Sequence, residues 1–222
     1  MGNYSWLKHM LEQETDPMTD KQKAVIKAAV ELFSEKGYAA TSTREIALRA
    51  GVSEGTIFKH YPTKKELMLS ITERIIHTAL FPLISSGISG LLAKSYKTRE
   101  EFLAAFLQNR IGLMQEAVPL FKIIFQEMPF QPEIRAMLIE QFKKMPFTAI
   151  AEKLRQGESP GPYAHSFSEA ELLQILLTCM SGFFILRNIM MPELFPKNRL
   201  QNDASTLVRF INLGLGNGGK GS

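Results

Sequence analysis

Cysteine and histidine are scarce in this sequence, and their scarcity limits the chemistry that the protein can perform. The single cysteine, Cys179, has no partner for an internal disulfide. The four histidines are dispersed along the chain, and neither a metal-ligand spacing nor a phosphate-binding glycine loop occurs. Because catalysis needs acid, base or nucleophilic groups that converge, we expect no enzyme, no cofactor and no bound metal.

Long uninterrupted apolar runs are also missing. The strongest candidate for a membrane span is residues 172–191, and five polar residues interrupt it: Gln174, Thr178, Ser181, Arg187 and Asn188. The remaining apolar pieces are far shorter than the roughly 20 residues that cross a bilayer. A helix buried on nearly every side is favoured over a membrane span. With no secretory pattern of basic start, apolar stretch and small-residue cleavage site, we expect a cytoplasmic protein without a membrane partner.

Positive charge is only slightly in excess over the whole chain, but it is concentrated in one region. Lysine and arginine number 26 against 22 acidic residues, for a net charge of +4, which permits an anionic partner without requiring one. Residues 19–66 contain nine basic and six acidic residues. Most of the positive excess therefore lies in less than a quarter of the chain.

The same region contains three clear helix starts. A Ser or Thr followed three residues later by Glu or Gln can satisfy the free N–H groups of a first helical turn. Three pairs have this spacing: Thr19 with Gln22, Ser42 with Glu45, and Thr63 with Glu66. They predict three helix N-termini within 45 residues.

Helix ends can be placed between these starts. Gly37 and Gly51 are expected to end the first two helices in left-handed conformations. Ser53 is a suitable N-cap for a third helix over 54–61, which Pro62 ends, and a fourth helix begins at Lys64 and continues to about Ala79 or beyond.

Helical spacing continues through the rest of the chain, so we predict an all-α fold. The later helices are expected at 98–116, 119–127, 133–155, 169–190 and 203–213, with Pro146 kinking or splitting the third of these. We predict an N-terminal extension over 1–18, a three-helix DNA-binding domain over 19–66, a helical effector-binding and dimerisation domain over 67–213, and a disordered tail over 214–222. The polar segment 157–167 is expected to be a mobile loop.

Residues 42–61 have the pattern of a helix-turn-helix. This motif needs a small residue where its helices touch, a turn residue that tolerates positive φ, and a branched apolar residue in the second helix. Ala47, Gly51 and Ile57 meet these needs at spacings of four and six. The spacing alone also occurs by chance, and the three surrounding helix starts make it specific.

The way in which such a motif binds DNA indicates which residues are candidate contacts. A recognition helix presents its N-terminal turns to the major groove, while flanking groups hold phosphates. The expected contacts from the second helix of the motif are Ser53, Glu54, Gly55, Thr56, Lys59 and His60. The expected phosphate contacts are Thr41, Ser42, Thr43, Arg44 and Lys64, near helix N-termini. Gly55 is unfavourable within a helix and is explained either by close approach to DNA or by a fit beside the first helix.

The runs 39–47, 50–61 and 64–67 resemble the DNA-binding domain of the TetR family of bacterial regulators. They read Ala-Ala-Thr-Ser-Thr-Arg-Glu-Ile-Ala, then Ala-Gly-Val-Ser-Glu-Gly-Thr-Ile-Phe-Lys-His-Tyr, then Lys-Lys-Glu-Leu. The similarity covers about residues 20–70 and is specific in order and spacing. It implies a homodimer whose C-terminal helices form a dimer interface and a ligand pocket, usually in a repressor that a small molecule releases.

One position departs from the family pattern. Where the family usually has a tyrosine that bonds a phosphate, this chain has Phe58, which lacks the hydroxyl group. Tyr61 or Lys59 could replace that contact, and Phe58 could instead pack against the sugar backbone or the turn. Phe58 and Tyr61 therefore complete the set of predicted DNA-binding residues.

In the C-terminal part, a dimer seam and a ligand pocket would both appear as excess apolar residues. By resemblance, the last two helices would pair with those of a second chain. Apolar pocket residues with one cationic anchor would suit a largely apolar ligand, although ordinary core, or a solvated face for Arg110, explains the same residues. The predicted pocket residues are Phe106, Arg110, Met114, Phe125 and Phe183.

These observations predict a sequence-specific transcription regulator, a repressor that a small, largely apolar ligand releases from operator DNA. The alternative is an effector-independent architectural or division-linked DNA-binding protein. Loss of DNA binding on addition of a ligand would distinguish the two.

Overall fold

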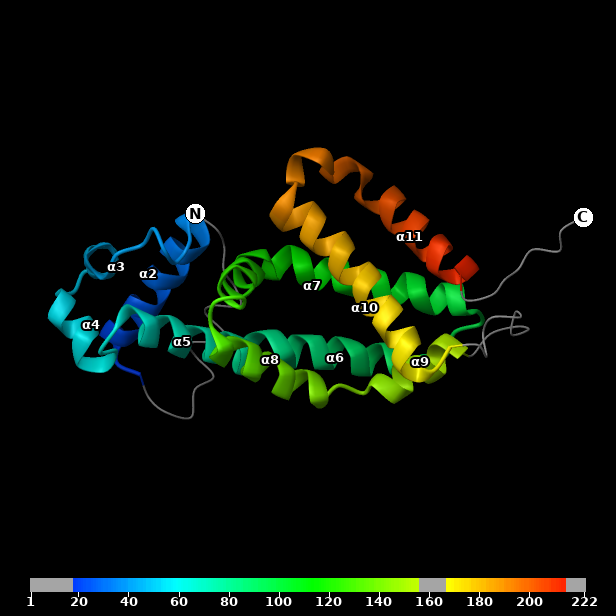
Figure 1. Cartoon of the computed structure of the whole chain (residues 1–222), viewed down its shortest axis with the longest axis horizontal. Helices are drawn as coiled ribbons and strands as arrows, with labels where there is room; N and C mark the ends of the chain where they lie inside the picture. The colour runs from blue at the N-terminus through cyan, green and yellow to red at the C-terminus, as the bar shows by residue number, and fades with distance from the viewer. Residues whose placement is uncertain (1–17, 156–166, 215–222) are drawn as a thin grey trace, which may run out of the picture. The chain divides into compact units, whose positions relative to one another are not determined.

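The computed structural model describes residues 18–155 and 167–214, and these ranges contain helices and no strand (Figure 1). The predicted all-α fold is confirmed. The predicted extension, the loop 157–167 and the tail lie outside the described residues, apart from single residues at their edges. Packing divides the chain into two compact units, one formed up to residue 84 and by 116–144, the other by 85–115 and from 145 onward. The functional boundary at residue 66 stays a prediction, because this division reports packing alone.

Local capping explains the first helices. Helix α2 (Asp20–Lys36) begins at the Thr19 capping box and α3 (Thr43–Ala50) at the Ser42 capping box, as predicted. Gly51 ends α3 in the left-handed conformation, at φ 68° and ψ 32°. Gly37 ends α2 with a positive φ of 85° but an extended ψ of 162°, so it is not left-handed helical as expected.

Helix α4 (Glu54–His60) begins at N-cap Ser53, and α5 (Lys64–Arg74) begins at the Thr63 capping box. The helix that starts at Lys64 continues through a π-helical turn, η1 (Ile75–Leu80), into α6 (Phe81–Leu92). The N–H of Phe81 donates to the carbonyl of Ile76, five residues earlier. This wider turn directly precedes Pro82, which has no N–H to donate, and so the helix passes through the proline.

Helix α7 (Arg99–Glu127) also differs from expectation, because it runs unbroken where a separation before Pro119 was predicted. Ala117 and Leu120 on either side are almost completely buried, and this packing outweighs the lost backbone hydrogen bond. Pro146 does split the following segment, as predicted, into α8 (Pro132–Lys143) and α9 (Phe147–Arg155).

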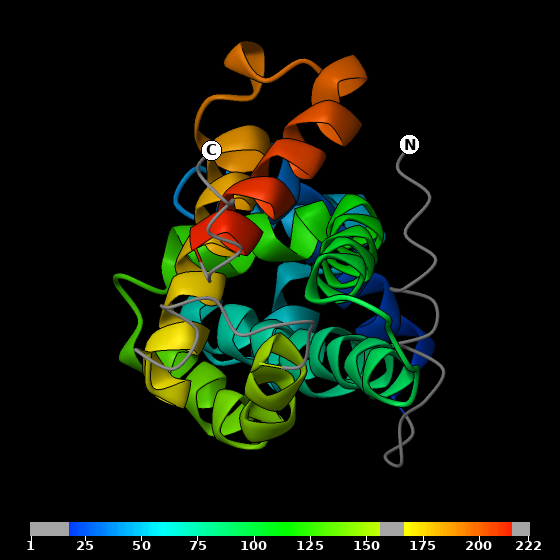
Figure 2. The same ribbon diagram turned by 90° about the vertical axis from the view of Figure 1, so that its right-hand side faces the viewer.

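The C-terminal segment is a helical hairpin. Helix α10 (Glu169–Ile185) begins at the predicted Ser168 capping box and ends in a π-helical turn, η2 (Leu186–Met190). Two 3-10 turns, η3 (Pro192–Leu194) and η4 (Lys197–Arg199), lead into α11 (Leu200–Gly214). The two views in Figures 1 and 2 show α11 turning back from the end of α10 through this connection.

Among the residues that the structure describes, two helical stretches, 64–92 and 169–190, are apolar and long enough to cross a membrane by length and composition alone. That is weak evidence, since core helices of soluble proteins pass the same test. Only 22% of the most apolar window of the second stretch is buried. The expectation that this helix is buried on nearly every side is therefore wrong for the single chain. Apolar composition predicts that a helix is buried, but it does not identify whether its own chain or another molecule buries it.

Candidate DNA-binding site

The turn between α3 and α4 has the geometry of a helix-turn-helix. Gly51 and Val52 donate their N–H groups to the carbonyls of Leu48 and Ala47, at 3.3 and 3.0 Å. Ala47 and Ile57, the predicted contact and locking residues, are both buried. Hydrogen bonds and apolar packing thus hold α4 against α3, and α2 also packs against α3 (Figure 1).

Hydrogen bonds among Lys36, Ser42 and Glu45 stabilise the N-terminus of α3. The hydroxyl of Ser42 accepts the N–H of Glu45, and the Glu45 carboxylate accepts the N–H of Ser42. The ammonium of Lys36 also donates to Glu45. The Lys36 hydrogen bond, followed by those from Ser42, lowers the pKa of Glu45 from its ordinary value of 4.5 to about 2.

This shift predicts acid sensitivity of the N-terminal unit. Because the folded pKa of Glu45 is depressed, its contribution to stability is fully present above about pH 4.5 and is lost as the pH falls through about 2. Replacing Glu45 with glutamine should therefore flatten the decline of the thermal unfolding midpoint between pH 5 and pH 2, as followed by circular dichroism. An unchanged acid dependence would contradict this assignment.

Helix α4 presents several predicted DNA-binding residues on its exposed surface. Gly55, Phe58, Lys59 and His60 are exposed, while Ile57 packs inward. An added Cβ at Gly55 would meet only the Ser53 hydroxyl, at 3.9 Å. The fit beside the first helix therefore does not explain this glycine, and close approach to DNA stays a prediction.

Neighbouring polar groups fix the start of α4. The Ser53 hydroxyl caps the N–H of Thr56 and lies 2.9 Å from the Thr56 hydroxyl. Thr43, from α3, donates its hydroxyl to Glu54. Arg44, the remaining predicted contact from α3, is exposed. The structure thus brings the starts of α3 and α4 together as one polar surface.

Two predicted contact residues are placed elsewhere. Thr41 is only 2% exposed, and its hydroxyl donates to the carbonyl of Gly37 at 2.8 Å. Tyr61 is 8% exposed, with its side chain hydrogen-bonded to Ser70, and burial raises its pKa. Both side chains support the fold instead of facing outward. Tyr61 is therefore a poor replacement for the hydroxyl that Phe58 lacks.

Lys64 makes intramolecular bonds where a phosphate contact was predicted. Its ammonium group donates to the carbonyls of Tyr38 and Thr41, at 2.9 and 2.8 Å, and lies 4.2 Å from the centre of the Tyr38 ring. The start of α5 is thereby tied to the loop that leads into α3. Sequence reasoning missed the part played by Tyr38, because no helical or capping pattern marks it.

The N-terminal unit also joins these helices to more distant segments. Lys65 forms an ion pair with Glu133 of α8 at 2.8 Å, and Gln22 of α2 lies 3.3 Å from the ring nitrogen of His60. Burial raises the pKa of Glu127, near the end of α7, and Lys64 opposes this rise. Helix α8 is therefore joined to the start of α5 by an ion pair, and Glu127 near the end of α7 lies within electrostatic range of Lys64.

The predicted pocket residues are divided between the two units. In the C-terminal unit the Arg110 guanidinium lies 5.4 Å from the centre of the Phe106 ring. Arg110 is 8% exposed, and burial lowers its pKa to about 10. The solvated face considered for Arg110 is therefore wrong. An added Cβ at Gly87 would lie 2.7 Å from Asn109 and 2.9 Å from Arg110, so this glycine makes room for both side chains.

The other predicted pocket residues do not join this pair in a described cavity. Phe125 belongs to the N-terminal unit and stacks on Phe121, and the Met114 side chain lies outside the described residues. Phe183 lines a groove between α10 and α11. Among the residues that the structure describes, no three His, Cys, Asp or Glu side chains are placed to hold a metal ion.

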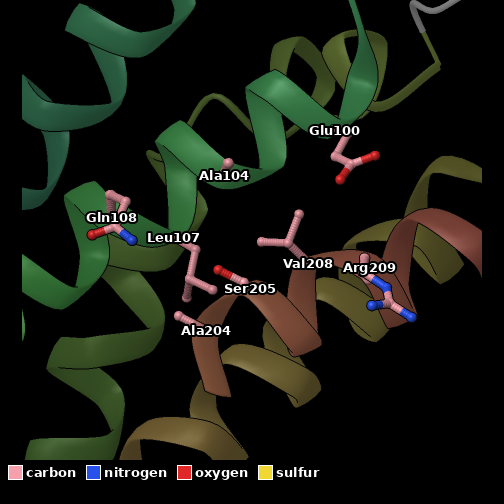
Figure 3. Close-up of a pocket in the computed structure, with 8 residues that line it drawn as sticks. All are labelled: Glu100, Ala104, Leu107, Gln108, Ala204, Ser205, Val208 and Arg209. Atoms are coloured by element: carbon pink, nitrogen blue, oxygen red, sulfur yellow. The ribbon is translucent and has the colours of Figure 1, made fainter. Parts of the chain in front are cut away.

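A smaller pocket of about 150 Å³ lies between α7 and α11 (Figure 3). Two facing rows of side chains line it: Glu100, Ala104, Leu107 and Gln108 from α7, and Ala204, Ser205, Val208 and Arg209 from α11. None of these residues was predicted to form a site.

Comparison with known proteins agrees with this geometry. Residues 25–71 match a family described as bacterial regulatory proteins, tetR family. An HTH-type transcriptional repressor of Mycobacterium tuberculosis is 30% identical over 117 residues, which span 47% of this chain and 62% of that protein. The match thus spans less than two thirds of that relative. The repressor BepR of Brucella suis is 28% identical over 171 residues, covering 74% of this chain and 78% of its own.

Solved structures share the fold at low sequence identity. A putative transcriptional regulator from Saccharomonospora viridis in complex with choline has a TM-score of 0.61 at 18% identity and covers 87% of this chain and 95% of its own. The regulator FadR from Bacillus subtilis in complex with stearoyl-CoA has a TM-score of 0.59 at 19% identity. The match covers 86% of this chain and 97% of the FadR chain.

Proposed function

Since this chain belongs to the TetR family of bacterial transcription regulators, we propose that it is a sequence-specific repressor that a small, largely apolar ligand releases from operator DNA. The observation that carries this proposal is the exposed surface of α4, with Lys59 and His60 beside the open approach at Gly55. Such a surface can enter a major groove, where lysine donates to guanine acceptors.

The start of α3 provides the phosphate contacts in this proposal. Arg44 is exposed there, and the helix dipole favours an anion at the N-terminus. Since Lys64 is bound to the Tyr38 and Thr41 carbonyls, its role is to position α3. Arg44 and the Ser42 turn would then meet the DNA backbone directly.

Two copies are needed for a palindromic operator. We propose a homodimer through α10 and α11, which would place two recognition helices in successive major grooves about 34 Å apart. The helix 169–190, with little of its apolar surface buried in the single chain, supports this arrangement.

Ligand release requires a route from the C-terminal helices to α3. Helix α8 forms an ion pair with Lys65, and Glu127 near the end of α7 interacts electrostatically with Lys64, so a ligand-induced shift of these helices would move the start of α5 and the loop before α3. Ligand and DNA would then weaken each other's binding by the same factor. Structural relatives crystallised with choline and stearoyl-CoA support a small-molecule effector and do not identify it.

Selection of bound sequences from a random DNA pool tests this function. A palindromic consensus is expected from a dimer that reads bases. DNA binding without a consensus would favour the architectural alternative. Titration of protein–operator complexes with a library of acyl and aryl compounds then tests release, and operator affinity that no compound changes would contradict an effector-regulated repressor.

Replacing Lys59 with alanine should relax base preference at one operator position. A good base contact provides about 1–3 kcal/mol of discrimination, so preference there should fall about tenfold or more, as measured by competition between operator variants. Lys27→Ala removes the same charge from an exposed position on α2 and is the matched control. Equal losses on every DNA sequence for both variants would refute base reading by Lys59.

A further inference from the structure

We propose that the pocket between α7 and α11 (Figure 3) binds an apolar α-amino acid in its zwitterionic form. This inference goes beyond the proposed function and does not depend on it. The pocket lies within the C-terminal unit and has a volume of about 150 Å³. A cavity of that size holds an apolar group about as large as benzene, which is close to the size of a leucine or phenylalanine side chain.

Polar contacts on either side of the pocket fix the spacing of the two helices. At one end, the Gln108 side chain of α7 donates to the side chain of Gln201 at 2.6 Å. At the other end, the buried Asn212 of α11 accepts from Arg99 at 3.0 Å and donates to Glu100 at 3.2 Å. A ligand between these contacts would therefore enter a space whose width is already set.

The side chains that face each other between these contacts are small or apolar. Ala104 and Ala204 have no atoms beyond Cβ with which to fill the space. Leu107 and Val208 form apolar walls, and both are almost completely buried. An apolar group that enters the pocket leaves water for these walls, which favours binding.

One charged side chain of each sign lies at the same end of the pocket. Figure 3 shows Glu100 of α7 and Arg209 of α11 there, on opposite helices. Both side chains are exposed, and no ion pair joins them in the part of the chain that the structure describes. An α-amino acid has its ammonium and carboxylate groups on one carbon, so Glu100 and Arg209 can bind one group each. A simple carboxylate would be repelled by Glu100, and a simple amine by Arg209.

The pocket and the groove beside α10 use different faces of α11. The α11 residues that line the pocket are Ala204, Ser205, Val208 and Arg209. Those that line the groove are Asn202, Asp203, Thr206, Leu207 and Phe210. At about 100° per residue, the two sets lie on opposite sides of the helix. Contacts made through the groove would therefore use other side chains of α11 than ligand binding does.

Isothermal titration calorimetry of the full chain with L-leucine tests the proposal. Two analogues each lack one charged group: 4-methylpentanoate has no ammonium, and 3-methylbutylamine has no carboxylate. Leucine should bind at least about tenfold more tightly than either analogue, because each analogue leaves one charged side chain without its partner. No saturable binding of leucine up to about 10 mM, or an analogue that binds as tightly as leucine, would overturn the proposal.

Neutralising each charge should remove the preference over one analogue. Glu100→Gln should weaken leucine binding about tenfold and abolish the preference over 4-methylpentanoate, while the glutamine oxygen can still accept from Asn212. Arg209→Gln should likewise abolish the preference over 3-methylbutylamine, and Arg209→Lys should restore most of the leucine affinity. Leucine affinities equal to that of the wild type in both glutamine variants would overturn these roles.

A pocket-filling variant tests where the ligand binds. Ala104→Leu places a larger side chain of a good helix former in the pocket and should abolish leucine binding, with unchanged helix content by circular dichroism. Arg135→Gln is the matched control for the loss of charge, since Arg135 is exposed on α8 in the N-terminal unit, and it should bind leucine like the wild type. Leucine binding that Ala104→Leu leaves unchanged would place the ligand elsewhere and overturn this site.

Discussion

Replacing Lys64 with methionine is expected to weaken operator binding about tenfold or more while leaving the N-terminal unit folded. Lys64 joins α5 to the loop before α3 through the carbonyls of Tyr38 and Thr41. Hydrogen bonds from charged donors contribute about 1.5–3 kcal/mol each, and a loss of 1.4 kcal/mol in binding corresponds to about tenfold in affinity. Without them, α3 and α4 should sample orientations that do not match the groove.

The salt dependence of binding separates positioning from direct phosphate contact. A lysine that neutralises one phosphate contributes about 0.9 to the slope of log affinity against log salt concentration. A positioning residue should leave this slope unchanged in fluorescence-anisotropy titrations between 50 and 200 mM salt. A slope reduced by about one unit in Lys64→Met would show that Lys64 contacts DNA.

Lys65→Met is the matched control, since it removes the same charge one residue later. Lys65 pairs with Glu133 at the surface, where ion pairs contribute about 0–1 kcal/mol. Its operator affinity should stay within about threefold of the wild type. Equal affinity losses in the two variants would indicate that net charge matters more than the Lys64 bonds.

Replacing Phe33 with alanine should have the largest effect on stability. Phe33 is almost completely buried in α2 and packs edge-on against Tyr38, at 5.5 Å between ring centres. Deleting a buried phenylalanine destabilises proteins by about 3–5 kcal/mol, which is a large part of a typical total of about 5–15 kcal/mol. Because Tyr38 also lies against Lys64, operator binding should fall as well.

Urea unfolding followed by circular dichroism measures this effect. Leu48→Ala is the control, because Leu48 is a similarly apolar residue of the same unit that is 83% exposed. Its free energy of unfolding should change by less than about 0.5 kcal/mol. A loss below about 1 kcal/mol in Phe33→Ala would mean that the cavity collapses or that this part of the core is loosely packed.

Local chemistry made the helix-turn-helix predictable. The Ser42 capping box, the left-handed Gly51 and the N-cap Ser53 act over three or four residues, so their pattern in the sequence is sufficient to place α3 and α4. The apolar spacing of Ala47 and Ile57 then determines which faces meet. The exposure of Lys59 follows from the same helical periodicity.

Interactions between distant residues decided the rest. Thr41 and Tyr61 have the polar groups of contact residues, but only the packed structure shows that they face the core. Lys64 finds its partners 23 and 26 residues away, and Arg110 packs beside Gly87 of another helix. No local pattern encodes such partners.

Continuity of the helices and burial of their apolar faces were likewise settled by tertiary structure. Whether a proline ends a helix depends on the packing gained by continuing it. Helix α7 continues past Pro119, whereas Pro146 separates α8 from α9. The apolar composition of the helical stretch 169–190 predicts burial, but in the single chain Leu177 of α10 and Leu186 of η2 are exposed. By itself the sequence determined the helix starts and the DNA-binding motif, because these depend on neighbours in the chain. The tertiary structure decided that polar side chains such as Thr41 and Tyr61 are buried, because burial depends on residues far apart.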